Sequence, residues 1–157
     1  MKRFLPLSFV LVAFCAASLA ALAVSATGSA DDDPKAIQGM WMPIKAELGG
    51  KPLPDALLKT ITLKLEDGKY DVHVGDEPDR GTYTLDSTAQ PKAITITGTE
   101  GPNRGKTYPA IYDLKIDQAK GDTLRICYDL SGAKRPTEFK TAAGTKLYLV
   151  AYRRKNP

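Results

Sequence analysis

The sequence predicts an all-β domain, an antiparallel up-and-down barrel or flattened barrel of about eight strands. Short segments alternate apolar and polar residues with the period of a strand, and turns rich in Gly, Asp and Pro separate them. No long amphipathic segment would supply a crossover helix between parallel strands. Several segments are apolar on both faces, which an open sheet with one wetted face does not explain.

The first thirty residues are typical of an exported protein. Two basic residues precede an uncharged apolar run from Phe4 to Val24, and small residues suited to cleavage follow. This pattern predicts a signal peptide at residues 1–26, cleaved after Ala26 or Ala30. At about 20 residues the run is also long enough to span a bilayer as an uncleaved anchor. In both cases we expect the domain in the periplasm, at the cell envelope or outside the cell.

A polar segment, residues 27–35, is predicted to be a flexible linker, which leaves 36–157 as the barrel domain. The formal charge of +4 falls to +2 when the two leading basic residues are removed, and the other Lys and Arg are interspersed with acids, apart from the basic run Arg153–Lys155. The basic stripe with interleaved aromatics that marks nucleic-acid binding is missing. We expect a monomer with no nucleic-acid partner, and membrane contact only if the N-terminal segment is uncleaved.

The elements follow in order from alternation and turn residues. Brief helical turns are expected at Pro34–Gln38 and Pro52–Leu58, and Pro54 suits a first helical turn. Asp67-Gly68 lies between two alternating runs and is a strong hairpin signal. The eight expected strands are Met40–Leu48, Thr60–Glu66, Tyr70–Val74, Gly81–Leu85, Ala93–Thr97, Lys106–Ile116, Thr123–Asp129 and Lys146–Arg154.

The first strand opens with Gly39-Met40-Trp41, which contains the only tryptophan. Gly-x-Trp at this place resembles the signature of the lipocalins and their calycin relatives. The resemblance implies that Trp41 plugs one end of the barrel. It also implies that an arginine of the last strand, Arg153 or Arg154, lies over the indole in a cation–π contact worth about 0.5–2 kcal/mol. Our structural candidates are Gly39, Trp41 and Arg153.

A second resemblance spans almost all of residues 36–157. It is to an uncharacterised family of exported lipocalin-like domains that is abundant in planctomycete bacteria, and it implies the fold and export without supplying catalytic residues. Met40 departs from the small polar residue that the family has at this place. The segments that carry the resemblance are Ile37–Trp41, Gly50–Pro54, Gly101–Thr107, Leu124–Cys127 and Arg135–Phe139.

Residues suited to catalysis or metal binding are few. His73 is the only histidine, which excludes a multi-histidine metal site, and we expect it at the surface or rim beside Asp71. Cys127 lies in the middle of an expected strand, where a lone cysteine is usually a small buried apolar residue, and it has no disulfide partner in the mature chain. Gly101–Thr107 has three residues between its glycines where a phosphate-binding loop has four. We therefore expect no enzymatic activity, no metal and no cofactor.

Tyrosine is abundant, with seven in the chain. Tyr112 and Tyr128 share strand parity with Leu114 and Leu124, so they are candidates for a pocket inside the barrel, although tyrosines on strands also serve as core. The expected function is non-enzymatic binding of a small, partly apolar ligand. The alternative is a ligand-free interaction or envelope-associated domain whose barrel is filled by its own side chains. Arg135–Phe139 is expected either to act as a lid at the rim or to cover the barrel mouth.

Overall fold

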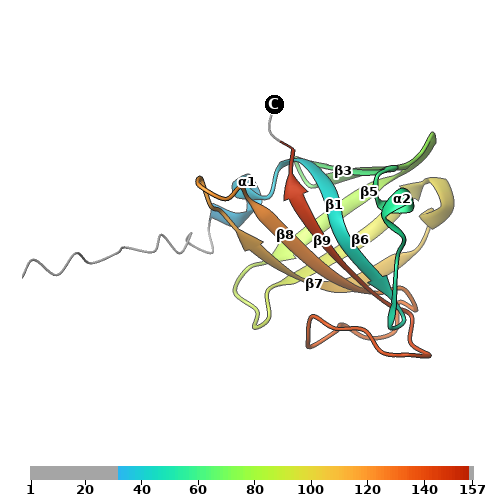
Figure 1. The fold of residues 1–157 in the computed structure, drawn as a ribbon. Helices are drawn as coiled ribbons and strands as arrows, with labels where there is room; N and C mark the ends of the chain where they lie inside the picture. Colours follow the sequence, from blue (N-terminus) through green and yellow to red (C-terminus); the bar gives the residue numbers. More distant parts are fainter. Residues whose placement is uncertain (1–31, 156–157) are drawn as a thin grey trace, which may run out of the picture.

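The computed structural model describes residues 32–155, whose strands form a closed antiparallel barrel (Figure 1). The elements in chain order are α1 (Asp33–Ala36), β1 (Gly39–Leu48), β2 (Lys51–Pro52), α2 (Asp55–Leu58), β3 (Ile61–Glu66), β4 (Lys69–Val74), β5 (Glu77–Asp86), β6 (Ala93–Glu100), the 3-10 helix η2 (Gly101–Asn103), β7 (Thr107–Lys115), β8 (Thr123–Asp129) and β9 (Leu147–Arg154).

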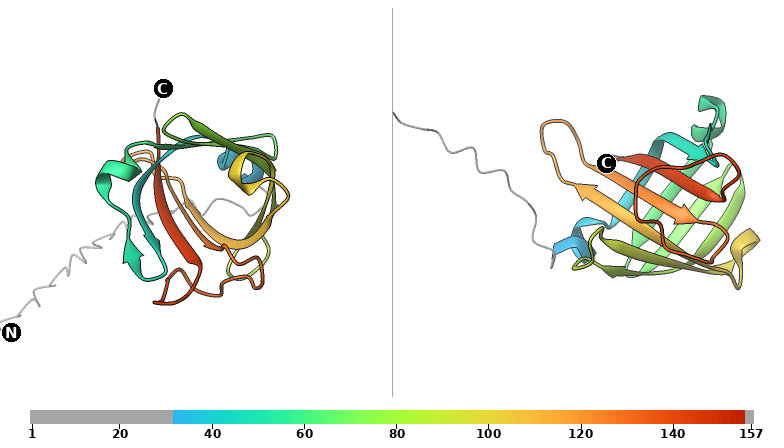
Figure 2. Two further views of the ribbon diagram at one scale, coloured as in Figure 1. Left: turned by 90° about the vertical axis from the view of Figure 1, so that its right-hand side faces the viewer. Right: turned by 90° about the horizontal axis from the view of Figure 1, so that it is seen from below.

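The sheet closes because β1 pairs with both β3 and the last strand, β9. Every other pairing joins strands that are neighbours in the chain, so the barrel of eight strands, β1 and β3–β9, has up-and-down topology. The two-residue β2 is an addition beside β1. This confirms the predicted all-β barrel. α1 and η2 lie at opposite ends (Figure 2), which we call the closed end and the open end, respectively.

Tight turns set the register between neighbouring strands. Asp67 and Gly68 have positive φ, 47° and 75°, as a two-residue hairpin of this type requires. From Glu66 opposite Lys69, β3 and β4 pair along their whole length without a shift. The predicted hairpin is confirmed. β5 begins at Glu77, four residues before the predicted strand Gly81–Leu85, because its first residues pair with the end of β4.

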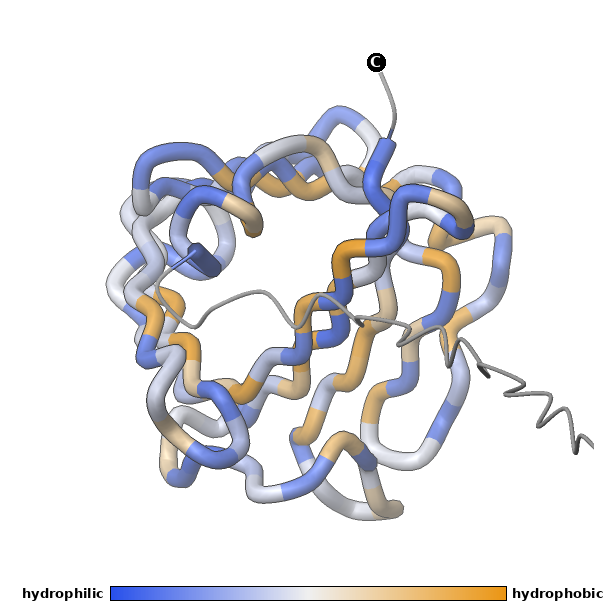
Figure 3. Tube along the Cα trace, turned by 90° about the vertical axis from the view of Figure 1, so that its left-hand side faces the viewer, coloured by the Kyte–Doolittle hydropathy of each residue, from blue (hydrophilic) through white to orange (hydrophobic). Residues whose placement is uncertain are grey.

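Alternation along the strands separates the core from the surface. On β3, Ile61, Leu63 and Leu65 are buried inside the barrel, while Lys64 and Glu66 are exposed. The same alternation of hydrophobic and hydrophilic residues is visible around the ring of strands (Figure 3). Burying a large apolar side chain stabilises the fold by about 1.5–3 kcal/mol, so this face of each strand fixes the register.

The connection between β8 and β9 lies on the outer wall of the barrel. Arg135 donates hydrogen bonds to the carbonyls of Ile94 and Ala110 and to Thr95 Oγ1 at 2.9 Å. Thr95 faces outward, because it alternates with the buried Ile94. The prediction that Arg135–Phe139 forms a lid or covers the barrel mouth is therefore wrong, since the segment is anchored to the outside of β6 and β7.

The same connection covers the only cysteine among the described residues. Cys127 is fully buried, and its Sγ lies 3.8 Å from the carbonyl of Lys140. Nearby, the guanidinium of Arg125 lies 4.5 Å from the ring centre of Phe139. Burial raises the pKa of the Cys127 thiol, which disfavours the reactive thiolate. This cysteine packs between barrel and connection.

The N-terminal predictions fall mainly on residues that the structure does not describe. The signal peptide (1–26), the alternative membrane anchor and most of the linker lie outside residues 32–155. Within the described range, no helix is both long and apolar enough to span a bilayer. The end of the predicted linker is not a free tether, because Asp33 begins α1 and is buried.

Candidate ligand-binding site

Trp41 fills the closed end of the barrel. Its side chain is completely buried, and the indole N–H donates to the carbonyl of Ile37 at 2.9 Å. The guanidinium of Arg154 lies 4.2 Å from the centre of the indole ring system, within cation–π range. Gly39, two residues before Trp41, has a φ of 130°, and a Cβ there would lie 2.6 Å from Arg154 Nη1. Glycine at this position therefore lets the arginine reach the ring.

Arg154 also ties the N-terminal segment to the barrel. It donates to the carbonyls of Ala36 and Gln38, and its Nε lies 2.7 Å from Asp122 Oδ2. Arg153, our candidate for the contact with Trp41, donates instead to the carbonyl of Lys120 at 2.9 Å. Of the two arginines expected over the indole, Arg154 makes the contact and Arg153 does not, because alternation along β9 turns Arg153 outward and places Arg154 on the inner side.

A buried polar cluster completes the closed end. Asp33 Oδ2 accepts hydrogen bonds from Lys92 Nζ at 2.6 Å and from the Tyr112 hydroxyl at 2.7 Å. Burial and the adjacent Asp33 carboxylate raise the pKa of Tyr112, so its hydroxyl stays a donor. Tyr112, predicted as a pocket residue, does point inward, but its hydroxyl is bound at the closed end and it does not line the cavity described below. That prediction is wrong.

The half of the barrel toward the open end is hollow. A cavity of about 180 Å³ lies inside it, with an apolar wall that includes Leu63, Val72, Ile96 and Ile126. It is smaller than the roughly 300–1,000 Å³ of sites for drug-sized ligands, so it fits only a small molecule. The interior is thus filled at one end and empty at the other. The tyrosines that line it are Tyr70, Tyr108, Tyr128, Tyr148 and Tyr152.

A carboxylate faces this cavity from β5. Asp79 Oδ1 accepts from the backbone N–H of Asn103 at 3.1 Å, and Asp79 Oδ2 accepts from Asn103 Nδ2 at 2.7 Å. The Tyr70 hydroxyl lies 3.4 Å from Oδ2, and the Tyr108 hydroxyl donates to Asn103 Oδ1 at 2.9 Å. η2 holds Asn103 in place, and its first residue, Gly101, has a φ of 78°. A polar corner therefore interrupts the apolar wall.

Tyrosines from β8 and β9 form the opposite side. The rings of Tyr128 and Tyr148 stack with centroids 5.8 Å apart. Burial raises the pKa of Tyr148 to about 12 and raises those of Tyr128 and Tyr152 as well. Their hydroxyls therefore remain neutral at physiological pH, and a neutral hydroxyl can both donate and accept a hydrogen bond.

Of the tyrosines and the aspartate that line the cavity, only one was predicted from the sequence as a pocket residue. Tyr128 lines it, as predicted. Tyr148 and Tyr152 share parity with the buried Val150, so the same pattern could have found them. The sequence pattern does not predict that Asp79 faces the cavity, because the residues before it have the composition of a turn and not the alternation of a strand.

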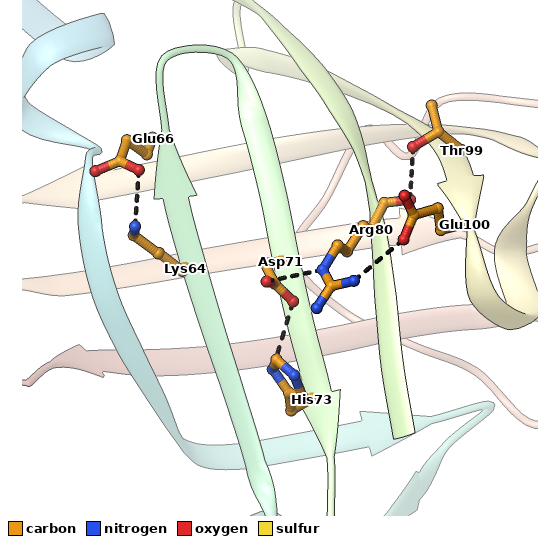
Figure 4. A network of polar contacts seen from close by, with 7 residues as sticks. All are labelled: Lys64, Glu66, Asp71, His73, Arg80, Thr99 and Glu100. Carbon is orange, nitrogen blue, oxygen red and sulfur yellow. Dashed lines mark hydrogen bonds and ion pairs between the residues drawn. The ribbon is translucent and has the colours of Figure 1, made fainter. Parts of the chain in front are cut away.

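The outer face of β3–β5 carries a separate polar network (Figure 4). Asp71 lies 3.0 Å from Arg80 Nε and 3.4 Å from His73 Nδ1, and Arg80 also pairs with Glu100 at 3.1 Å. His73 is accordingly on the surface side, beside Asp71. Among residues 32–155, no group of three or more His, Cys, Asp or Glu side chains is placed to hold a metal ion.

Comparisons of the chain with protein-family models, curated proteins and solved structures found no match. The closed antiparallel barrel of eight strands is compatible with a lipocalin-like fold. Membership of the exported planctomycete family stays a prediction from the sequence.

Proposed function

We propose that this protein is a non-enzymatic binding module that holds a small, partly apolar ligand in the cavity at the open end. One observation carries the proposal: a hollow of about 180 Å³ lies inside a barrel whose other end is densely packed. Its lining combines apolar side chains with a few polar groups, the composition typical of small-molecule sites. A barrel filled by its own side chains throughout would have no such space.

The cellular setting is part of the proposal. The predicted signal peptide and the resemblance to an exported family support a role in the periplasm, at the cell envelope or outside the cell. There the module would bind its ligand as a monomer, without a nucleic-acid partner. The alternative, a ligand-free interaction or envelope-associated domain, requires no bound molecule, so a search for one separates the two functions.

Native mass spectrometry of protein purified from its own cell envelope tests the proposal. We expect a small molecule to accompany the wild-type chain and to be lost from Ile96→Phe, because the larger side chain fills the cavity. Ile44→Phe is the matched control, since Ile44 is 52% exposed on the outer face of β1. An equal bound mass on both variants, or none on the wild type, would contradict binding in the cavity.

A further inference from the structure

We propose that the ligand is a small organic cation, an amine or ammonium on an apolar body, with its charge beside Asp79. This inference rests on the proposed function, because it concerns the same cavity. Asp79 is the only carboxylic acid among the described lining residues, and none of them is Lys, Arg or His. The cavity therefore presents one negative charge and no positive one.

The protein itself does not neutralise that charge. Asn103 and Tyr70, the partners of Asp79, are uncharged donors. Within residues 32–155, no ion pair includes Asp79. The adjacent Arg80 is turned to the outer face, where it pairs with Asp71 and Glu100. An ionised carboxylate has about four acceptor positions, and these three contacts leave one for a ligand N–H group.

The aromatic lining favours the same sign of charge. The face of a tyrosine ring is electron-rich and attracts a cation within about 6 Å of its centre. Five tyrosines line this small space, and the rings of two of them, Tyr128 and Tyr148, stack on each other. Their neutral hydroxyls can accept hydrogen bonds from an ammonium group. An anion would instead meet the Asp79 carboxylate.

Three probes of similar shape test the sign of the charge: 2-phenylethylamine (a cation), 2-phenylethanol (neutral) and 3-phenylpropionate (an anion). Isothermal titration calorimetry of the purified protein measures each affinity. We expect the amine to bind about tenfold more tightly than the alcohol, as one charge pair at the rim of a protein interior allows, and the carboxylate to bind most weakly. Added salt should weaken only amine binding.

Substitutions then test the assignment to Asp79. Asp79→Asn keeps the shape and removes the charge, so the affinity for the amine should fall about tenfold while that for the alcohol changes less than about twofold. Asp71→Asn is the matched control, because it removes a carboxylate from the outer face of neighbouring β4.

The outcomes separate this inference from the proposed function. Equal affinities for amine and alcohol, or tightest binding of the carboxylate, would overturn the cation while leaving a binding site. Unchanged amine affinity in Asp79→Asn would overturn the role of Asp79. Failure of all three probes to bind, together with no bound mass on the protein from its own envelope, would overturn both proposals.

Discussion

The two ends of the barrel are built from the same strands, yet they differ in how space and polar groups are used. At the closed end, Trp41 fills the interior, and Asp33 bonds Lys92 and Tyr112. At the open end, Asp79 and the tyrosines surround a cavity. Filling the interior strengthens a fold and emptying it weakens one. The closed end of the barrel therefore supplies stability, and the open end supplies space for a ligand.

The largest effect should come from removing the plug. Trp41→Ala leaves a cavity at the closed end and should lower the free energy of unfolding by about 3–5 kcal/mol. Chemical denaturation measures this loss. The exposed Ile44 on the same strand gives a control, because Ile44→Ala should cost less than about 1 kcal/mol. A loss below about 1 kcal/mol for Trp41→Ala would show that the closed end does not depend on this residue.

Two neighbouring inward positions on β6 compare the ends directly. Ile94 is fully buried outside the cavity, whereas Ile96 lines it. Ile94→Phe overpacks the filled half and should cost about 1–3 kcal/mol, but Ile96→Phe enters empty space and should cost less than about 1 kcal/mol. Thermal and chemical denaturation of both variants test the difference. Equal losses would mean that the two halves are equally well packed.

The adjacent arginines of β9 give a smaller contrast. Arg154→Lys keeps the charge but loses the planar guanidinium that stacks on Trp41 and reaches two backbone carbonyls, so stability should fall by about 1–2 kcal/mol. Arg153→Lys, which alters an exposed side chain, should change it by less than about 0.5 kcal/mol. Denaturant titration of the pair measures both. Equal free energies of unfolding for the two variants would contradict the assignment of Arg154 to the inner side and Arg153 to the outer side of β9.

The pH dependence of stability should report the buried tyrosines of the open end. The pKa of Tyr148 is raised by burial from 10.0 to about 12. Because the folded state holds the proton more tightly, this contribution to stability is complete below pH 10 and is lost as the pH rises to 12. Denaturation between these pH values should show falling stability, with a smaller slope in Tyr148→Phe. An equal pH dependence of stability in the wild type and in Tyr148→Phe would mean that another group causes the loss.

The alternation of apolar and polar residues predicted those features of the fold that depend on the local sequence. The strands, the Asp67-Gly68 hairpin and the special position of Trp41 follow from period, turn chemistry and one motif. Tyr112 shows the limit of such a prediction. The position of a residue in the alternation indicates whether its side chain points inward, but not at which height along the barrel axis it lies. That height depends on the register of all the strands. Asp79 was not predicted because the residues before it, Gly75–Pro78, have the composition of a turn. Pairing with β4 nevertheless makes this segment the first part of strand β5.

Closure of the barrel also constrains how the chain folds. Trp41 pairs with Arg154 across β1 and β9, so nearly the whole domain lies between the two partners. A contact between such distant residues forms only after the entropy of ordering the intervening chain has been overcome, which slows folding. Any chain that stops before β9 would leave two unpaired strand edges and an indole without its arginine. Folding of this domain therefore cannot finish until its last strand is available.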